Sequence, residues 1–121
     1  MKLNEYQQKA MSTCTESSSN VPYMLLNLVG EVGELTSKLA KAIRKEEIVL
    51  INNKFVKCEY NPFFDDVFER GLELEMGDIL WQLSGLCSVM GWRLEDVAQM
   101  NLDKLQGRKK NDTIVGDGDN R

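Results

Sequence analysis

One pattern occurs twice in this chain of 121 residues, and it constrains the fold more than any other feature of the sequence. Residues 28–35 and 72–79 both read Leu-x-x-Glu, an apolar residue, Gly, an acid and an apolar residue. On a helix each residue turns by about 100°, so two acids three positions apart project from nearly the same face. The pattern therefore predicts two helices, each with a pair of carboxylates beside its apolar stripe.

The two carboxylate pairs would meet if these helices pack together. The resulting cluster would contain Glu31, Glu34, Glu75 and Asp78. Four like charges repel one another unless cations lie among them, and carboxylate oxygens suit hard ions such as Mg²⁺. Glu-x-x-Glu is also common on the solvated face of a helix, so the spacing alone does not select a metal site. Gly33 and Gly77 recur at matching positions, which favours a need for close approach or open space there.

Apolar residues at helical spacing predict an all-α fold of the four-helix-bundle type. The predicted helices span residues 3–14, 22–45, 66–90 and 94–110. Gly91 is expected to end the third helix. The inner stripe of that helix is predicted to contain Leu72, Met76, Ile79, Leu83, Leu86 and Met90. Leu74 and Trp81 lie on its opposite side, so we expect a second buried face there that meets another subunit.

Residues 48–64 differ in character and form a predicted insertion between the second and third helices. Two apolar segments flank Asn52 and Asn53, which predicts a short β-hairpin; a long irregular connection is the alternative. Residues 111–121 are rich in Gly, Asp and Asn, and this composition predicts a disordered tail. The whole chain, residues 1–121, is expected to form a single domain.

Composition excludes several classes of function. A net charge of -4 argues against a general nucleic-acid binder. The absence of histidine removes most zinc chemistry, histidine-based nucleophilic triads and the Glu-x-x-His ligation of di-iron bundles. No stretch approaches the ~20 apolar residues of a membrane span, and the N-terminus lacks the apolar region of a secretory signal. We therefore expect a cytoplasmic protein with no membrane partner.

The predicted fourth helix carries a basic flank. Asn101, Lys104 and Arg108 lie at positions i, i+3 and i+7, within about 60° of one another. Of these, Lys104 and Arg108 would supply cations for phosphate groups on the side of the pocket opposite the acids. The alternative is a basic helix C-terminus that interacts with the helix dipole. Lys38, one turn after Glu34, is placed either to reach a phosphate or to pair with Glu34.

These residues resemble the MazG-like nucleotide pyrophosphohydrolases, the all-α nucleoside triphosphate pyrophosphatases. The family pattern of Glu-x-x-Glu, a spacer and Glu-x-x-Asp matches the four acids. Residues 101–108 look like the family's Asn-x-x-Lys-Leu-x-x-Arg helix, and residues 116–121 are similar to the ending of a bacterial and phage branch. The resemblance covers the chain except residues 48–64, where the spacer is longer than usual.

The resemblance implies a Mg²⁺-dependent enzyme, with Mn²⁺ as an alternative ion, that cleaves a (d)NTP to a (d)NMP and pyrophosphate. The four acids would bind the metal, and a metal-bound water would attack the α-phosphorus. The resemblance also implies a homodimer or a dimer of dimers. The substrate contacts that the resemblance implies, the last three of which would fold over the nucleotide, are Asn101, Lys104, Arg108, Asp119, Asn120 and Arg121. Lys38 is a further candidate contact from its spacing alone.

Two other functions stay open on the sequence. One is a non-catalytic helical module whose acidic cluster serves metal-dependent assembly or partner binding. The other is an enzyme like phosphoribosyl-ATP pyrophosphohydrolase, which has a similar acidic helix pair. A ferritin-like di-iron site is a distant third, because the chain has no histidine for that motif.

Overall fold

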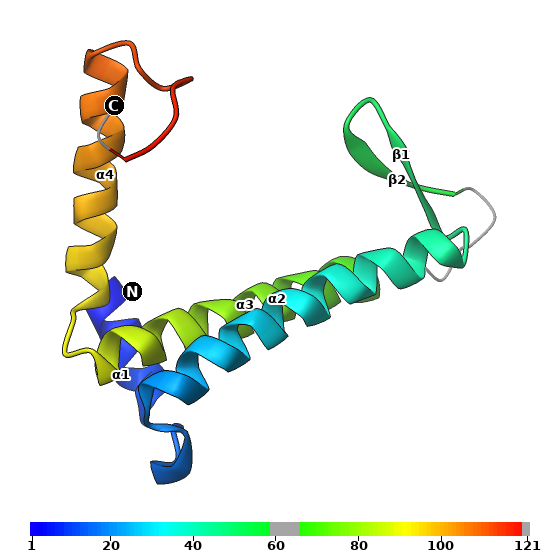
Figure 1. Ribbon diagram of the computed structural model, residues 1–121. Coiled ribbons are helices and arrows are strands. Elements are labelled where there is room, and N and C mark those ends of the chain that lie inside the picture. The colour runs from blue at the N-terminus through cyan, green and yellow to red at the C-terminus, as the bar shows by residue number, and fades with distance from the viewer. Residues whose placement is uncertain (59–65, 120–121) are drawn as a thin grey trace.

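The computed structural model describes residues 1–58 and 66–119, and it confirms an all-α fold with one small β-hairpin (Figure 1). The helices are α1 (Leu3–Met11), α2 (Val21–Arg44), α3 (Asp66–Val89) and α4 (Leu94–Lys110). A short 3-10 helix, η1 (Glu16–Ser18), precedes α2, and the hairpin strands are β1 (Ile48–Ile51) and β2 (Lys54–Lys57). Within the described residues, no helix combines the length and the apolar character that crossing a bilayer requires.

Helices α2 and α3 pack against each other as a long antiparallel pair (Figure 1). Helix α2 begins where the Asn20 side-chain oxygen accepts the backbone N–H of Tyr23 at 2.9 Å. The helices approach closely at Gly85, because a Cβ there would overlap the sulfur of the fully buried Met24. The two glycines of the repeated pattern differ from Gly85, since a Cβ at either would meet open space.

The hairpin between α2 and α3 confirms the short β-hairpin predicted from the sequence. Asn52 and Asn53 both have positive φ angles, of 50° and 61°, as a two-residue type I′ turn requires. The alternative of an irregular connection is therefore wrong for residues 48–57. The hairpin stands at the far end of the helix pair (Figure 1), where Ile48 packs on Leu39, Ala42 and Phe68. Residues 59–64 of the predicted insertion lie outside the described residues.

Side chains of helix α1 form hydrogen bonds with both the end of α3 and the start of α4. The Gln7 amide nitrogen donates to Ser88 Oγ at 2.9 Å and to the Trp92 carbonyl oxygen at 3.0 Å. The Gln7 amide oxygen accepts the backbone N–H of Leu94 at 2.8 Å. The next backbone N–H along α4 donates to Asn4 Oδ1 at 3.1 Å. Two side chains of α1 thus satisfy the first N–H groups of α4, a role that a residue directly before a helix usually fills.

Trp81 packs against the end of α1 in its own chain. Its indole N–H donates to the Ala10 carbonyl oxygen at 3.1 Å and to Thr13 Oγ1 at 2.9 Å. The sequence placed Trp81 with Leu74 on a face of α3 that meets another subunit. The structure corrects this for Trp81, because α1 packs back on the C-terminal half of α3, whereas Leu74 is exposed.

Helix α4 leads away from the α2–α3 pair (Figure 1). As predicted, Gly91 ends the preceding helix, with a φ of 72° that favours glycine. Leu94 at the start of α4 is buried, but Leu102 and Leu105, which follow it at helical spacing on one apolar stripe, are exposed. Within one chain, the apolar stripe of α4 is covered only at its beginning.

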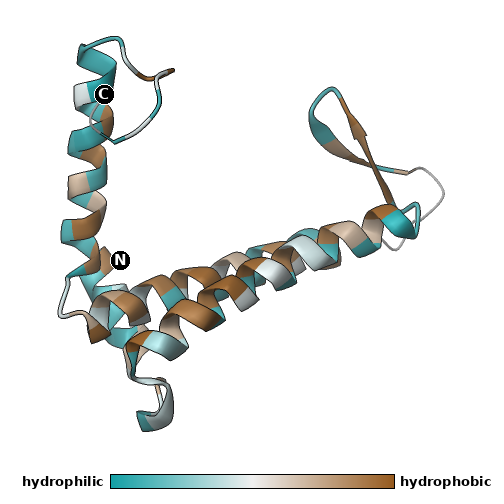
Figure 2. Ribbon diagram, viewed as in Figure 1, coloured by the Kyte–Doolittle hydropathy of each residue, from teal (hydrophilic) through white to brown (hydrophobic). Residues whose placement is uncertain are grey.

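Much apolar surface is exposed in the single chain. The accessible surface is 9349 Å², whereas a compact monomer of 13.8 kDa would have about 6,600 Å². Figure 2 shows apolar residues along the whole α2–α3 pair. Half of the predicted inner stripe of α3 is exposed, namely Met76, Leu83 and Met90, with Met76 at 61%. The prediction that these three residues lie inside is therefore wrong for one chain, since periodicity identifies an apolar face but not what covers it.

Candidate metal and phosphate site

Three of the four predicted acids lie together. Glu31 and Glu34 extend from α2 and Glu75 from α3, and one carboxylate oxygen from each lies within 4.8 Å of the others. The packing of α2 against α3 brings these three carboxylates together, as the repeated pattern predicted. Asp78 lies outside this group of three, but it is near enough that its negative charge contributes to raising the pKa of Glu31.

Glu75 is the most enclosed of these acids, with 7% of its surface exposed. Its Oε1 pairs with Lys38 Nζ at 2.6 Å. Its Oε2 is buried and has no hydrogen-bond partner among the described residues. A buried polar atom left unpaired costs about 1–3 kcal/mol, so a cation at this oxygen would be stabilising. The expected Lys38 pair with Glu34 is wrong, because the ion pair of Lys38 crosses to α3 instead.

The pKa of Glu31 is raised above its ordinary value of 4.5. Burial of the carboxyl group is the largest cause, and the charges of Asp78, Glu34 and Glu75 add to it. A hydrogen bond donated by the Asn27 amide at 2.9 Å acts in the opposite direction. Glu31 is therefore surrounded by like charges, and binding of either a proton or a metal ion would reduce their mutual repulsion.

Two neighbours of the acids were not predicted from the sequence. Asn27 stands four residues before Glu31, a spacing that could have indicated the contact. Tyr6 comes from α1, and its pKa is raised by burial and by the charge of Asp78. No local pattern indicates that Tyr6 lies near the acids, because its position depends on how α1 packs on α3.

A hollow of about 390 Å³ adjoins the acids on the α2 side. It is lined by Gly30, Gly33, Glu34, Ser37, Lys38 and Lys41. Glu34 and Lys38 belong both to the hollow and to the surroundings of the acid cluster. The two lysines give the hollow a positive side next to the carboxylates, which is the charge pattern that a metal–phosphate ligand needs. Neither Ser37 nor Lys41 was predicted as a site residue.

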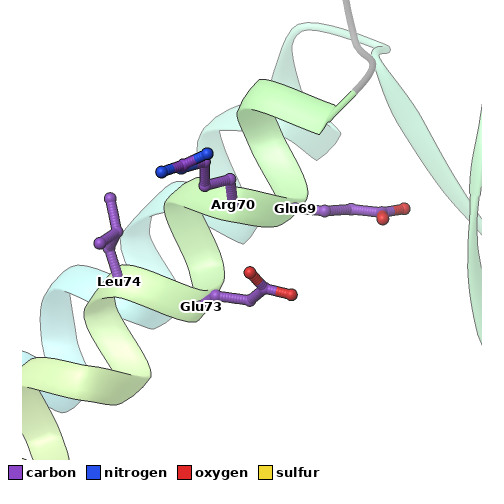
Figure 3. A pocket seen from close by; sticks show the side chains of 4 residues that line it. All are labelled: Glu69, Arg70, Glu73 and Leu74. Carbon is purple, nitrogen blue, oxygen red and sulfur yellow. The ribbon is translucent and has the colours of Figure 1, made fainter.

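A second hollow, of about 460 Å³, lies on the outer face of α3 and is lined by Glu69, Arg70, Glu73 and Leu74. Figure 3 shows Glu69 and Glu73 pointing to one side of the helix, while Arg70 and Leu74 lie on the other. None of the predicted site residues lines this hollow. Glu73 is exposed there.

The basic residues of α4 contact the tail of their own chain. Lys104 Nζ and Arg108 Nη2 donate to Asp119 Oδ1 at 3.1 and 3.0 Å, while Asn101 is exposed. Residues 111–119 thus fold back on α4, so the prediction of disorder is wrong for them. The expectation that α4 closes the pocket over the acids is also wrong within one chain, because α4 leads away from α2 and α3 (Figure 1). The predicted contacts Asn120 and Arg121 lie outside the described residues.

The acid cluster fits a hard divalent cation. Its donors are all carboxylate oxygens, one of which is buried without a partner. The carboxylates whose negative charge raises the pKa of Glu31 would be stabilised by the positive charge of such an ion. The described acids can therefore hold a metal ion between α2 and α3.

A comparison with protein families identifies the chain. The model of the MazG nucleotide pyrophosphohydrolase domain matches residues 20–113. The chain belongs to the MazG family. The matched residues run from the cap of α2 to the end of α4 and include all four predicted acids. The resemblance seen in the sequence is thus confirmed, and with it membership in a family of nucleotide pyrophosphohydrolases.

A relative of this MazG-family chain comes from a bacteriophage. The Gene 37 protein of Mycobacterium phage L5 is 35% identical over 107 residues, which cover 88% of this chain and 81% of that protein. No solved structure matches the chain significantly.

Proposed function

We propose that this MazG-family protein is a Mg²⁺-dependent nucleoside triphosphate pyrophosphohydrolase that releases pyrophosphate and a nucleoside monophosphate. The observation that carries the proposal is the group of three carboxylates within 4.8 Å, one with a buried unpaired oxygen. This group lies inside the residues that match the MazG nucleotide pyrophosphohydrolase domain.

The acids are assigned to hold the metal ion. Glu31, Glu34 and Glu75 would contribute oxygen ligands, and Asp78 would contribute from the edge of the cluster. A Mg²⁺ ion, or Mn²⁺ in its place, would neutralise phosphate charge and lower the pKa of a water for attack at the α-phosphorus. The acids thereby fix where the α-phosphate must lie.

Lys38 is assigned to the substrate phosphates. It now neutralises Glu75 at 2.6 Å and also lines the hollow that contains Lys41. A metal ion in the acid cluster would take over the neutralisation of Glu75. Lys38 would then be available to a phosphate group in the hollow, with Lys41 beside it.

The proposed assembly is a homodimer or a dimer of dimers. Two exposed apolar stripes support it, Leu25, Val29 and Val32 on α2 and Met76, Leu83 and Met90 on α3. By helical spacing, the α2 stripe lies more than about 100° around the helix from Glu31 and Glu34, so an interface there leaves the acids open. The chain exposes roughly 2,700 Å² more than a compact monomer would, and a standard interface needs about 800 Å² from each partner.

Asn101, Lys104 and Arg108 are proposed as further substrate contacts. Because α4 leads away from the acids of its own chain, we infer that they serve a nucleotide held by a neighbouring copy. Mixing an inactive Glu75→Gln chain with an inactive Lys104→Ala chain should then restore part of the activity, because some mixed sites are intact. No recovery after mixing would place both groups in the same chain.

A nucleotide panel tests the proposed reaction. Each nucleoside and deoxynucleoside triphosphate is incubated with Mg²⁺, and pyrophosphate and orthophosphate are measured separately. We expect pyrophosphate from the wild type and from the control Glu73→Gln, and none from the double variant Glu34→Gln, Asp78→Asn. Orthophosphate as the product, or undiminished activity of the double variant, would contradict the proposal.

The same panel separates the alternatives. Phosphoribosyl-ATP is included, and cleavage of this compound alone would indicate the related enzyme class. A non-catalytic assembly module would show Mg²⁺-dependent changes in association state with no turnover of any nucleotide.

A further inference from the structure

The carboxylate of Asp119 is bound by the two cations of α4. Its Oδ1 accepts hydrogen bonds from Lys104 Nζ at 3.1 Å and from Arg108 Nη2 at 3.0 Å. Arg108 Nη2 also donates to the carbonyl oxygen of Gly118 at 3.0 Å. The Arg108 side chain is only 9% exposed, although α4 leads away from the other helices. The tail therefore covers a guanidinium that would otherwise face solvent.

Asp119 is an incomplete partner for this pair of cations. A single oxygen, Oδ1, serves both Lys104 and Arg108. Arg108 Nε is buried and has no hydrogen-bond partner among the residues that the structure describes. A phosphate group offers three or more oxygens in a tetrahedral arrangement, so it can bind Lys104 and two N–H groups of one guanidinium together. The unpaired Nε is the donor that such an anion would satisfy.

The contact is also open to exchange. The Asp119 side chain is 80% exposed, and that of Lys104 is 40% exposed. Asp119 can therefore leave toward solvent, and another anion can approach, without any change in α4. The start of the tail is fastened separately, because the Thr113 N–H donates to the Arg108 carbonyl oxygen at 2.9 Å. Asp119 is thus tethered close to the cations, which gives it a high effective concentration there.

We propose that Asp119 is a tethered internal anion: it occupies the phosphate-binding groups of Lys104 and Arg108 until a phosphate or pyrophosphate group displaces it. The inference rests on the proposed function insofar as a nucleotide supplies the phosphates. It gives Asp119 a role opposite to the substrate contact implied by the family resemblance, since Asp119 competes with the substrate for the same donors.

The test is a calorimetric titration of the full chain with inorganic pyrophosphate, without divalent metal. Asp119→Asn should bind pyrophosphate about three- to tenfold more tightly than the wild type, because the ion pairs that the exposed Asp119 carboxylate makes with Lys104 and Arg108 no longer compete. Asp117→Asn is the matched control, because it removes the same charge from an exposed position on the same tail. Its affinity should stay within about twofold of the wild type, since the remaining effect is screened by solvent and salt. Equal tightening in both variants would overturn the proposal, and so would weaker binding by Asp119→Asn.

Backbone amide NMR provides a second measurement. In the wild type, pyrophosphate should move the signals of Gly116 and Gly118 toward their positions in Asp119→Asn. Signals that stay in place while pyrophosphate binds would show that the tail is not displaced and would overturn the proposal. Because neither measurement needs turnover, tighter binding by Asp119→Asn without nucleotide cleavage keeps the internal anion and removes the proposed function. Cleavage with unchanged pyrophosphate affinity in Asp119→Asn does the reverse.

Discussion

Glu75 differs more from a surface carboxylate than the other acids of the cluster do, because it is buried and one of its oxygens is unpaired. We expect Mg²⁺ to raise the melting temperature of the wild type, since a ligand that binds only the folded state stabilises it. In Glu75→Gln the increase should fall to less than about half, because a neutral amide is a much weaker ligand for a hard cation. The measurement is the melting temperature with and without Mg²⁺.

The control for this prediction is Glu73→Gln, two residues away on the exposed side of α3. It should keep the whole Mg²⁺-dependent increase, since Glu73 is outside the cluster. A Glu75→Gln protein that Mg²⁺ stabilises as much as the wild type would remove Glu75 from the metal site.

Glu31 makes the stability of the metal-free protein depend on pH. Its pKa in the folded protein is raised above 4.5, mainly by burial. Between the unfolded and the folded pKa, the folded state holds more protons, so this contribution to stability falls as the pH rises through that window. In EDTA, the wild type should therefore gain more in melting temperature than Glu31→Gln when the pH is lowered from 7 to 5. An equal gain in both proteins would contradict the prediction.

At the scale of residues, the sequence predicted that Glu31, Glu34 and Glu75 lie together, but it did not predict the residues that surround them. Glu31 and Glu34 share a helix face at any packing geometry, so their proximity is encoded locally. The pairing of Lys38 with Glu75 depends on the rotation and register of two helices. The effect of the Asp78 charge on the pKa of Tyr6 depends in addition on where α1 lies. Neither of these two interactions can be predicted from a local sequence pattern.

Within the α2–α3 pair, Gly85 is the glycine that the packing requires. Gly85→Ala should lower the free energy of unfolding by about 1–2 kcal/mol, because Met24 is fully buried and has little room to shift. Gly77→Ala on the same helix meets open space and should raise it by about 0.5–1 kcal/mol, the helix-propensity difference. Urea denaturation measures both. Destabilisation by Gly77→Ala would contradict the open space at that position.

The elements themselves were largely predictable, and their arrangement was not. Helical spacing located the helices, and the pair Asn52 and Asn53 predicted the hairpin because both tolerate positive φ. No local sequence pattern indicated the direction in which α4 runs. It is set by Gln7 and Asn4 of α1, which hold the first amides of α4 from far away in the chain.

The exposed apolar stripes have a consequence for the whole molecule. If a second copy covers them, the melting temperature should fall on dilution, because dissociation and unfolding are linked by mass action. Val29→Glu should give a monomer in analytical ultracentrifugation, since Val29 is 72% exposed in one chain and a charge there harms only an interface. Gln8→Glu adds the same charge at an exposed position of α1 and should leave the association state unchanged. A Val29→Glu protein that associates as the wild type does would exclude this face.

The bonds that α1 makes to α4 also set where this domain can be cut. The family match begins at residue 20, so a fragment trimmed to it would keep Glu31, Glu34 and Glu75 of the acid cluster. It would lose Gln7 and Asn4, and with them the fixed entry of α4. It would also uncover Trp81. Such a fragment would retain the acid cluster but would lose the hydrogen bonds that orient α4. Residues 1–19 therefore belong to the folded unit although the family boundary leaves them out.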